Sequence, residues 1–274
     1  MSSIVRPIAL TIAGSDPSGG AGLQADLKTF TALGVYGASV VTALTAQNTL
    51  GVTGVHKVPA DFIRAQFLAV TSDLQVSAIK TGMLGDQETV RAVAGLLQAI
   101  RAPIVVDPVM VATSGDVLLA PDAVDALRRE LIPLARVITP NLPEAAKLLD
   151  TTLAESEAEM CDQARALLRL GCQAVLVKGG HGQTGESVDA LATGTDLHRF
   201  VKPRIATQNT HGTGCALAAA LTSGLAQGLE IPAAVERAKE FVWRALSSGA
   251  LQKIGAGNGP IDFVFAVQNP TRDN

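Results

Sequence analysis

One short stretch of this chain joins a reactive side chain to backbone that is suited to an anion. The segment Asn209-Thr210-His211-Gly212-Thr213-Gly214-Cys215 places two glycines around a threonine, and it leads into an Ala- and Leu-rich stretch, Thr213–Gly228, that reads as a helix. Backbone N–H groups at a helix start point at a bound anion, and the helix dipole adds roughly half a positive charge. Such a site could hold a phosphoryl group during its transfer. The same glycines could instead serve only a tight turn with positive φ, and the residues leave both interpretations open.

Cys215 falls in the first turn of that predicted helix. The pKa of a free thiol, about 8.5, can be lowered at a helix N-terminus, which would make Cys215 a base or a polarising partner near neutral pH. A cysteine in an Ala-rich helix can also be a small buried hydrophobe, which is how we interpret Cys161 and Cys172. The position of Cys215 beside the predicted anion site favours the chemical role.

Two carboxylates, an amide and a cation follow predicted strands. Asp107 ends the apolar run Ile104–Val106, and Asn141 and Glu144 follow the strand Val137–Thr139. A carboxylate and an amide three residues apart on a helix could hold Mg²⁺, yet the same spacing is typical of a capping box. Lys178 ends the run Ala174–Val177 and could pair with a phosphate, or it could be a solvated strand end.

The Gly-rich turn near the N-terminus is a weaker signal. The residues Gly20–Ala25 match G-x-G-x-x-A, a pattern typical of dinucleotide-binding turns. That motif also requires an acidic residue about 20 positions later, and the segment Val40–Leu50 contains none. No Gly-Lys-Ser or Gly-Lys-Thr occurs in the chain, which excludes a P-loop. A NAD-dependent oxidoreductase is therefore disfavoured.

Short apolar runs alternate with segments of helical period, which predicts a largely parallel sheet covered by helices on both faces. We expect one domain over residues 1–274, because no linker or internal repeat interrupts the pattern. Ligands of such sheets bind beyond the carboxyl ends of the strands, where the residues above fall. The expected strands are Ile8–Ala13, Val40–Ala46, Ala78–Thr81, Ile104–Asp107, Val137–Thr139 and Ala174–Val177, with a hairpin of Ser187–Thr193 and Leu197–Val201. The expected helices include Gly22–Leu33, Ala60–Leu74, Asp86–Ile100, Thr213–Gly228 and Pro232–Leu251.

Composition narrows the possible partners and compartment. The formal net charge is −3, which argues against nonspecific binding to nucleic acid or an anionic membrane. Two long uncharged stretches, Thr29–His56 and Ile205–Leu229, are interrupted by polar residues and predict buried strands, loops and a packed helix rather than membrane spans. We see no secretion signal over Met1–Pro7, and the three cysteines lack metal-ligand spacing. A reducing cytoplasm fits this cysteine usage.

Seven motifs in order resemble the ribokinase superfamily, and specifically its hydroxymethylpyrimidine/phosphomethylpyrimidine kinase branch of thiamin biosynthesis. The resemblance covers nearly the whole chain. Its carriers are Ala13–Gly22 with Gln24–Thr29, Thr42–Thr49, Lys80–Leu84, Val106–Met110, Asn141–Glu144, Lys178–His181 and Asn209–Cys215. The fold that this resemblance implies is α/β, a ribokinase-like three-layer sandwich with a mostly parallel central sheet. The implied partners are ATP, Mg²⁺, a small-molecule substrate and a second copy of the chain in a homodimer.

The resemblance also implies a reaction and roles for individual residues. ATP would phosphorylate 4-amino-5-hydroxymethyl-2-methylpyrimidine and then its monophosphate to the diphosphate. Cys215 would stand where most of the superfamily has an aspartate base. The anion hole would be formed by Gly212, Thr213 and Gly214. The pyrimidine would lie among Gly14, Asp26, Gln47, Met83 and Val109. Asp107 and Glu144 would bind the metal, and Asn141 and Lys178 would lie near the nucleotide.

Two alternatives stay open at this point. A pyridoxine or pyridoxal kinase of the same branch would phosphorylate a similar flat ring with a hydroxymethyl group. A noncatalytic sensor would bind the pyrimidine without transfer, although the presence of Asp107, Glu144 and Cys215 argues against it. We further expect the segment Val111–Leu118, with its Ser114-Gly115-Asp116 turn, to close over the substrate.

Overall fold

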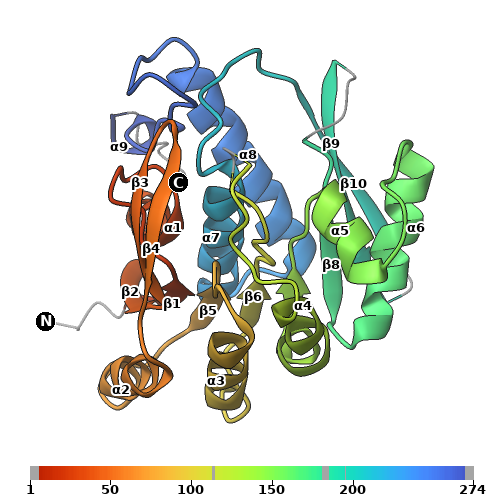
Figure 1. Cartoon of the computed structure of the whole chain (residues 1–274). Helices are drawn as coiled ribbons and strands as arrows, with labels where there is room; N and C mark the ends of the chain where they lie inside the picture. The colour runs from red at the N-terminus through yellow and green to blue at the C-terminus, as the bar shows by residue number, and fades with distance from the viewer. Residues whose placement is uncertain (1–5, 113–114, 181–184, 195, 269–274) are drawn as a thin grey trace, which may run out of the picture.

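An eight-stranded, mostly parallel sheet runs through the molecule (Figure 1). The computed structural model describes residues 6–112, 115–180, 185–194 and 196–268. The strand order is β10-β9-β8-β7-β6-β5-β1-β2, in which only β9 runs opposite to the other strands and is antiparallel to both of its neighbours. The strands are β1 (Ile8–Ala13), β2 (Tyr36–Val41), β5 (Ala78–Thr81), β6 (Ile104–Val106), β7 (Val137–Ile138), β8 (Ala174–Lys178), β9 (Glu186–Thr193) and β10 (Asp196–Pro203).

Helices cover both faces of this sheet (Figure 1), so the predicted α/β three-layer architecture is confirmed. One face packs against α1 (Gly22–Ala32), α7 (Thr213–Ala226) and α8 (Ile231–Gly249). The other packs against α2 (Ala60–Thr71), α3 (Gln87–Leu97), α4 (Ala123–Ala126), α5 (Leu142–Leu149) and α6 (Glu157–Leu167). A wider turn over Leu127–Leu131, single 3-10 turns at Ile132–Leu134 and Leu168–Leu170, and a short α9 (Phe265–Gln268) complete the elements.

The predicted strand Val40–Ala46 is wrong, because this run belongs to two different sheets. Its first residues end β2, and its last residues begin β3 (Ala43–Asn48), which within the described part of the chain pairs only with β4 (Gly51–Lys57). At the change of direction, the Thr42 hydroxyl donates to the Met83 carbonyl oxygen at 2.7 Å. An apolar run shows the extended backbone but not which strand it pairs with, since pairing depends on distant residues.

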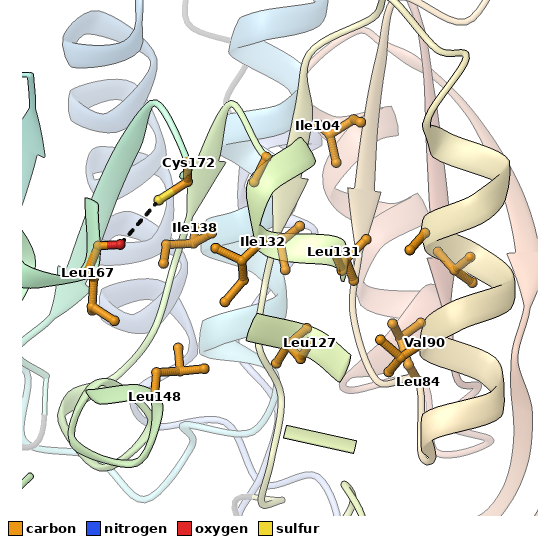
Figure 2. Packing of buried hydrophobic residues seen from close by; sticks show 14 of the residues in the cluster. Leu84, Val90, Ile104, Leu127, Leu131, Ile132, Ile138, Leu148, Leu167 and Cys172 are labelled. Carbon is orange, nitrogen blue, oxygen red and sulfur yellow. Dashed lines mark hydrogen bonds between the residues drawn. The ribbon is translucent and has the colours of Figure 1, made fainter. Parts of the chain in front are cut away.

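The apolar core on the α2–α6 side joins side chains from many elements (Figure 2). Leu131 and Ile132 are fully buried between strand residues such as Ile138 and helix residues such as Val90. Burying one such side chain contributes about 1.5–3 kcal/mol. Cys172 also belongs to this core, and its thiol donates a long hydrogen bond of 3.7 Å to the Leu167 carbonyl oxygen (Figure 2). Its predicted role as a small hydrophobe agrees with this position.

The uncharged stretch Ile205–Leu229 contains the buried helix α7. Every residue from Ala216 to Leu225 is buried, between the sheet on one side and α1 and α8 on the other. A helix that is apolar all round must be enclosed, which explains the missing charges. Within the described residues, no helix is both long and apolar enough to cross a membrane.

Candidate active site

A cavity of about 630 Å³ lies at the carboxyl ends of the parallel strands. Strand ends, the β1–α1 turn, the β3–β4 hairpin and the starts of α5 and α7 contribute to its wall. All but one of the site residues predicted from the sequence line it. They are Gly14, Gln47, Met83, Asp107, Val109, Asn141, Glu144, Lys178, Gly212, Thr213, Gly214 and Cys215.

Strand alternation explains why the charged side chains meet beneath α7. Ala78, Val105 and Leu176 all pack into the core on the α7 side of the sheet. Side chains two residues further along a strand point to the same face. This period places Lys80 at the end of β5, Asp107 just beyond β6 and Lys178 at the end of β8 under the start of α7.

The start of α7 presents backbone N–H groups to the cavity. Gly212, the residue before the helix, has a φ of 79°, which glycine adopts without strain. Among the described residues, the N–H groups of Gly212, Gly214 and Cys215 have no hydrogen-bond acceptor. Thr213 differs from the prediction, because its N–H and its hydroxyl both donate to the Thr210 carbonyl oxygen, at 3.2 and 2.6 Å. Thr213 therefore stabilises the turn, and the available donors are those of its neighbours.

Asp107 and Lys178 form a buried pair beside these N–H groups. Lys178 Nζ donates to Asp107 Oδ1 at 2.9 Å, and the Thr139 hydroxyl donates to the same oxygen at 2.9 Å. A Cβ added at Gly214 would lie 3.3 Å from Lys178 Nζ, so the ammonium lies directly against the start of α7. Cation and helix start thus face one small volume, which suits a phosphate.

Asn141 and Glu144 form the capping box of α5 and also line the cavity. The Asn141 side chain accepts from the Glu144 N–H at 2.9 Å, and Glu144 Oε2 accepts from the Asn141 N–H at 2.8 Å. The two interpretations of this motif are therefore compatible. Burial raises the pKa of Glu144 to about 7, with Lys178 opposing the rise and Asp107 adding to it.

Part of the cavity wall lies where the hairpin meets the Gly-rich turn. The Thr45 hydroxyl donates to the Ser15 carbonyl oxygen at 2.8 Å, which fixes β3 across the turn, and Gln47 follows on the same side of the strand. A Cβ at Gly14 would lie only 3.0 Å from Met83 Sδ. Together with Val109, these residues line one part of the cavity, which we call the slot, and Gln47 supplies a side-chain amide to it.

Comparison with known proteins identifies the family. The sequence model of the phosphomethylpyrimidine kinase family matches residues 16–262. A hydroxymethylpyrimidine/phosphomethylpyrimidine kinase of Rhizobium meliloti is 56% identical over 254 residues, covering 93% of this chain and 96% of that protein. A thiamine biosynthesis bifunctional protein of Geobacter sulfurreducens is 49% identical over 265 residues, covering 96% of this chain and 54% of that longer protein. This chain belongs to the phosphomethylpyrimidine kinase family.

The structural comparison confirms the ribokinase-like fold of this phosphomethylpyrimidine kinase family member. Bacillus subtilis pyridoxal kinase, solved as an ADP complex, superimposes with a TM-score of 0.89 at 37% sequence identity. The match covers 97% of this chain and 100% of the pyridoxal kinase. Family and relatives together make the chain a kinase of thiamin biosynthesis, as the motifs predicted.

In this kinase the environment of Cys215 differs from the expectation of a lowered pKa. Burial raises the pKa of the Cys215 thiol to about 11. Lys80 and the Gly22 N–H lower it, whereas Asp26 and Asp107 raise it. The helix start is therefore outweighed by desolvation and by two nearby carboxylates. At neutral pH the thiol is protonated, so Cys215 can orient a substrate hydroxyl group by accepting a hydrogen bond but is not a ready base.

Asp26 is the predicted site residue that does not line the cavity. Its carboxylate is fully buried and accepts two hydrogen bonds of 2.8 Å from Lys80 Nζ and one of 2.6 Å from the Thr11 hydroxyl. These bonds occupy the oxygens that a substrate would need. Lys80 lines the cavity in its place, which the sequence analysis missed because nothing local marks a lysine in a short apolar strand as an ion-pair partner.

The pair Asp16 and His211 was also missed. Asp16 Oδ2 lies 2.8 Å from His211 Nε2 and accepts from the N–H groups of Gly20 and Ala21, at 3.1 and 2.8 Å. Burial alone would raise the pKa of Asp16, but the hydrogen bonds from His211, Ser18 and Ala21 lower it to about 2. The carboxylate thus ties the Gly-rich turn to the loop before α7. Its place in a Ser-Asp-Pro-Ser turn was the only available signal.

The donor atoms suit a magnesium ion that arrives with the nucleotide. Asp107 and Glu144 supply carboxylate oxygens, the ligands that Mg²⁺ prefers, and Asp107 Oδ2 has no hydrogen-bond partner among the described residues. The described chain contains no group of three His, Cys, Asp or Glu side chains that could enclose a metal. Mg²⁺ is commonly held by one or two carboxylates together with substrate phosphates, which fits this arrangement.

Proposed function

We propose that this kinase transfers the γ-phosphoryl group of ATP to the hydroxymethyl oxygen of 4-amino-5-hydroxymethyl-2-methylpyrimidine, and then phosphorylates the resulting monophosphate. We also propose that residues 1–274 act as one domain. The observation that carries the assignment is one continuous cavity. It joins the slot of Gly14, Gln47, Met83 and Val109 to the start of α7 and Lys178. A flat ring in the slot would direct its hydroxymethyl group toward the unpaired N–H groups.

The first transfer forms a bond between the substrate oxygen and the γ-phosphorus while the bond from that phosphorus to the β,γ-bridging oxygen breaks. The products are the phosphate ester, ADP and the proton of the hydroxyl group. Negative charge on the transferred group would be met by the N–H groups of Gly212, Gly214 and Cys215 and by Lys178. These donors are fixed by the fold before the reaction begins, so little reorganisation is needed.

The second transfer uses a phosphate oxygen of the monophosphate as the attacking atom. A phosphate monoester is already mostly ionised near neutral pH, whereas an alcohol must lose a proton. The sulfur of Cys215 would therefore assist the first transfer by accepting a hydrogen bond from the alcohol, which orients the attacking oxygen, and would have less to do in the second. A loose transition state requires little deprotonation before the phosphorus is attacked, which suits a protonated thiol.

Mg²⁺ would be held by Asp107 and Glu144 through its oxygen ligands and water. When bound, it would neutralise charge on the phosphates of ATP. Burial disfavours the charged form of Glu144, and a cation would remove that penalty. Asn141, which fixes Glu144 through the capping box, and Lys178 would lie near the nucleotide.

Pyridoxal phosphorylation is the second candidate, because the Bacillus subtilis protein with the same fold is a pyridoxal kinase. The chain is 56% identical to the hydroxymethylpyrimidine/phosphomethylpyrimidine kinase of Rhizobium meliloti but only 37% identical to this pyridoxal kinase, which favours the pyrimidine as the substrate.

We further propose a cytoplasmic homodimer. Leu44 and Leu50 at the β3–β4 hairpin, with Tyr36 on the edge strand β2, are large apolar side chains left exposed for a partner. Sedimentation at two concentrations measures that association.

The deciding experiment is mass analysis of the products from purified protein, ATP, Mg²⁺ and the pyrimidine alcohol. We expect the monophosphate to appear first and the diphosphate to follow. Pyridoxal is tested in parallel at equal concentration, and Lys178→Met is the matched control for a contaminating kinase. Product from pyridoxal alone would reverse the assignment. Binding of the pyrimidine with no ATP-dependent product would indicate a sensor.

A further inference from the structure

A third buried lysine–aspartate pair also lines the cavity, beside the strand that carries Lys178. Lys239 Nζ donates to Asp189 Oδ2 at 2.7 Å, and both side chains are more than nine-tenths buried. Lys239 is the one charged residue among the buried positions of α8, where its neighbours include Val235 and Val242. Replacing a buried ion pair by apolar side chains is often neutral or stabilising, so stability alone does not account for it.

Asp189 lies directly across the sheet from Lys178. In the antiparallel pairing of β8 with β9, Lys178 and Asp189 are cross-strand partners. Side chains at such positions point to the same face, with Cβ atoms about 4.5–5.5 Å apart. Lys178 therefore has Asp189 at its side in addition to Asp107 and Glu144 at the phosphate end. It donates to Asp107, at 2.9 Å.

Both oxygens of Asp189 are already occupied. Oδ1 accepts from the Gly179 N–H at 3.0 Å, and Oδ2 accepts from Lys239. Gly179 packs so closely on β9 that an added Cβ would lie 2.0 Å from the Val188 carbonyl oxygen, which keeps that N–H in place. Without Lys239, Asp189 would have an uncompensated buried charge beside a lysine of the neighbouring strand.

We propose that Lys239 is a positioning residue: by occupying the Asp189 carboxylate, it keeps Lys178 paired with Asp107 and directed at the phosphate end of the cavity. This inference rests on the proposed function in one respect, namely that Lys178 meets a phosphate of the nucleotide. It assigns Lys239 no contact with the reacting atoms. Lys239 thus acts on catalysis indirectly, because it prevents Asp189 from competing with Asp107 for Lys178.

The proposal predicts an asymmetry that a purely structural pair would not show. Lys239→Met leaves Asp189 free to capture Lys178, whereas Asp189→Asn removes the competing charge and still offers an oxygen to the Gly179 N–H. Both variants break the ion pair, so both are expected to unfold at lower temperature. We expect kcat/KM for ATP to fall about 10²-fold in Lys239→Met, as for misplaced catalytic groups in general. In Asp189→Asn the loss should stay below a few-fold.

The decisive variant combines the two substitutions. Lys239→Met with Asp189→Asn is expected to regain most of the activity lost in Lys239→Met, because the competitor is gone. Adding Lys239→Met to Lys178→Met should cause little further loss, since residues acting in one chain of contacts are non-additive. Glu157→Gln, which breaks the exposed ion pair of Arg199 between α6 and β10, is the control and should leave the kinetics unchanged.

Binding of ADP, measured by calorimetry, makes the test independent of the substrate. Lys239→Met should weaken ADP binding, and the double substitution should restore it, even if the pyrimidine proves not to be phosphorylated. Equal losses in Lys239→Met and Asp189→Asn, or a double variant no better than Lys239→Met, would overturn the proposal. The second result would indicate that Lys239 contacts the nucleotide itself. Absence of product from the wild-type protein would count against the proposed function alone.

Discussion

Replacing Gly212 by alanine tests whether the backbone at the start of α7 carries the reaction. Gly212 has a φ of 79°, and an added Cβ would lie 1.8 Å from the Gly20 carbonyl oxygen. Real Cβ atoms essentially never approach a heavy atom closer than 3.0 Å, so the two backbone segments must move apart. The required movement, about 1 Å, is the scale at which misplaced groups lower a rate by about 10²-fold.

Two effects on Gly212→Ala can be separated by magnitude. The left-handed backbone conformation costs an alanine roughly 1–2 kcal/mol of stability. The displacement also removes N–H groups from the transferred phosphoryl group, and losing one such donor lowers kcat by about 10²–10³. We therefore expect kcat to fall by at least about 10²-fold in protein that is still folded at the assay temperature.

Gly228→Ala is the matched control at the other end of the same helix. Gly228 has a φ of 84°, and an added Cβ would meet no atom within 4 Å. The variant should have a similar penalty in stability, lowering the unfolding temperature by a few degrees, and retain wild-type kcat. Thermal unfolding and initial rates at saturating ATP and pyrimidine are measured for both variants. If Gly212→Ala retains as much kcat as Gly228→Ala, the anion site at α7 is wrong.

Three further predictions follow from the same site. Cys215→Ala should slow the first transfer more than the second, and equal losses measured for the two rates would refute the assigned role. Because burial raises the pKa of Glu144 to about 7, its contribution to stability is present below pH 4.5 and lost as the pH rises to about 7. The unfolding temperature of the metal-free protein should therefore fall more steeply over that interval than that of Glu144→Gln; parallel curves would contradict the pKa. Val111–Leu118 is predicted to close over the substrate, although residues 113–114 of it lie outside the described part. Its backbone amides should exchange hydrogen more slowly when ADP and pyrimidine are added. Unchanged exchange would exclude this role.

Local signals in the sequence determined several elements and part of the site. The strands Ile8–Ala13 and Ala78–Thr81 end where they were predicted to end, each directly before a glycine, Gly14 or Gly82. The capping box of Asn141 and Glu144 formed as its spacing predicted, since its partners are three residues apart. Such features depend on neighbours in the chain, so a single sequence is sufficient to find them.

Tertiary structure decided which charges meet and what their surroundings do to them. Lys80 and Asp26 are 54 positions apart, His211 and Asp16 are 195 apart, and Lys239 and Asp189 are 50 apart. Nothing in the local sequence of these residues identifies the partner. Asp26 therefore looked like a substrate ligand, although folding encloses it completely.

Cys215 combines both cases, since its position follows from local sequence and its pKa follows from tertiary structure. Its place at a helix start was correctly predicted, but burial and two carboxylates from distant segments outweigh that helix start. Desolvation depends on all the atoms that surround a group, and these come from every layer of the fold. The sequence by itself determined which residues reach the end of the sheet, and packing decided the charge each one has there.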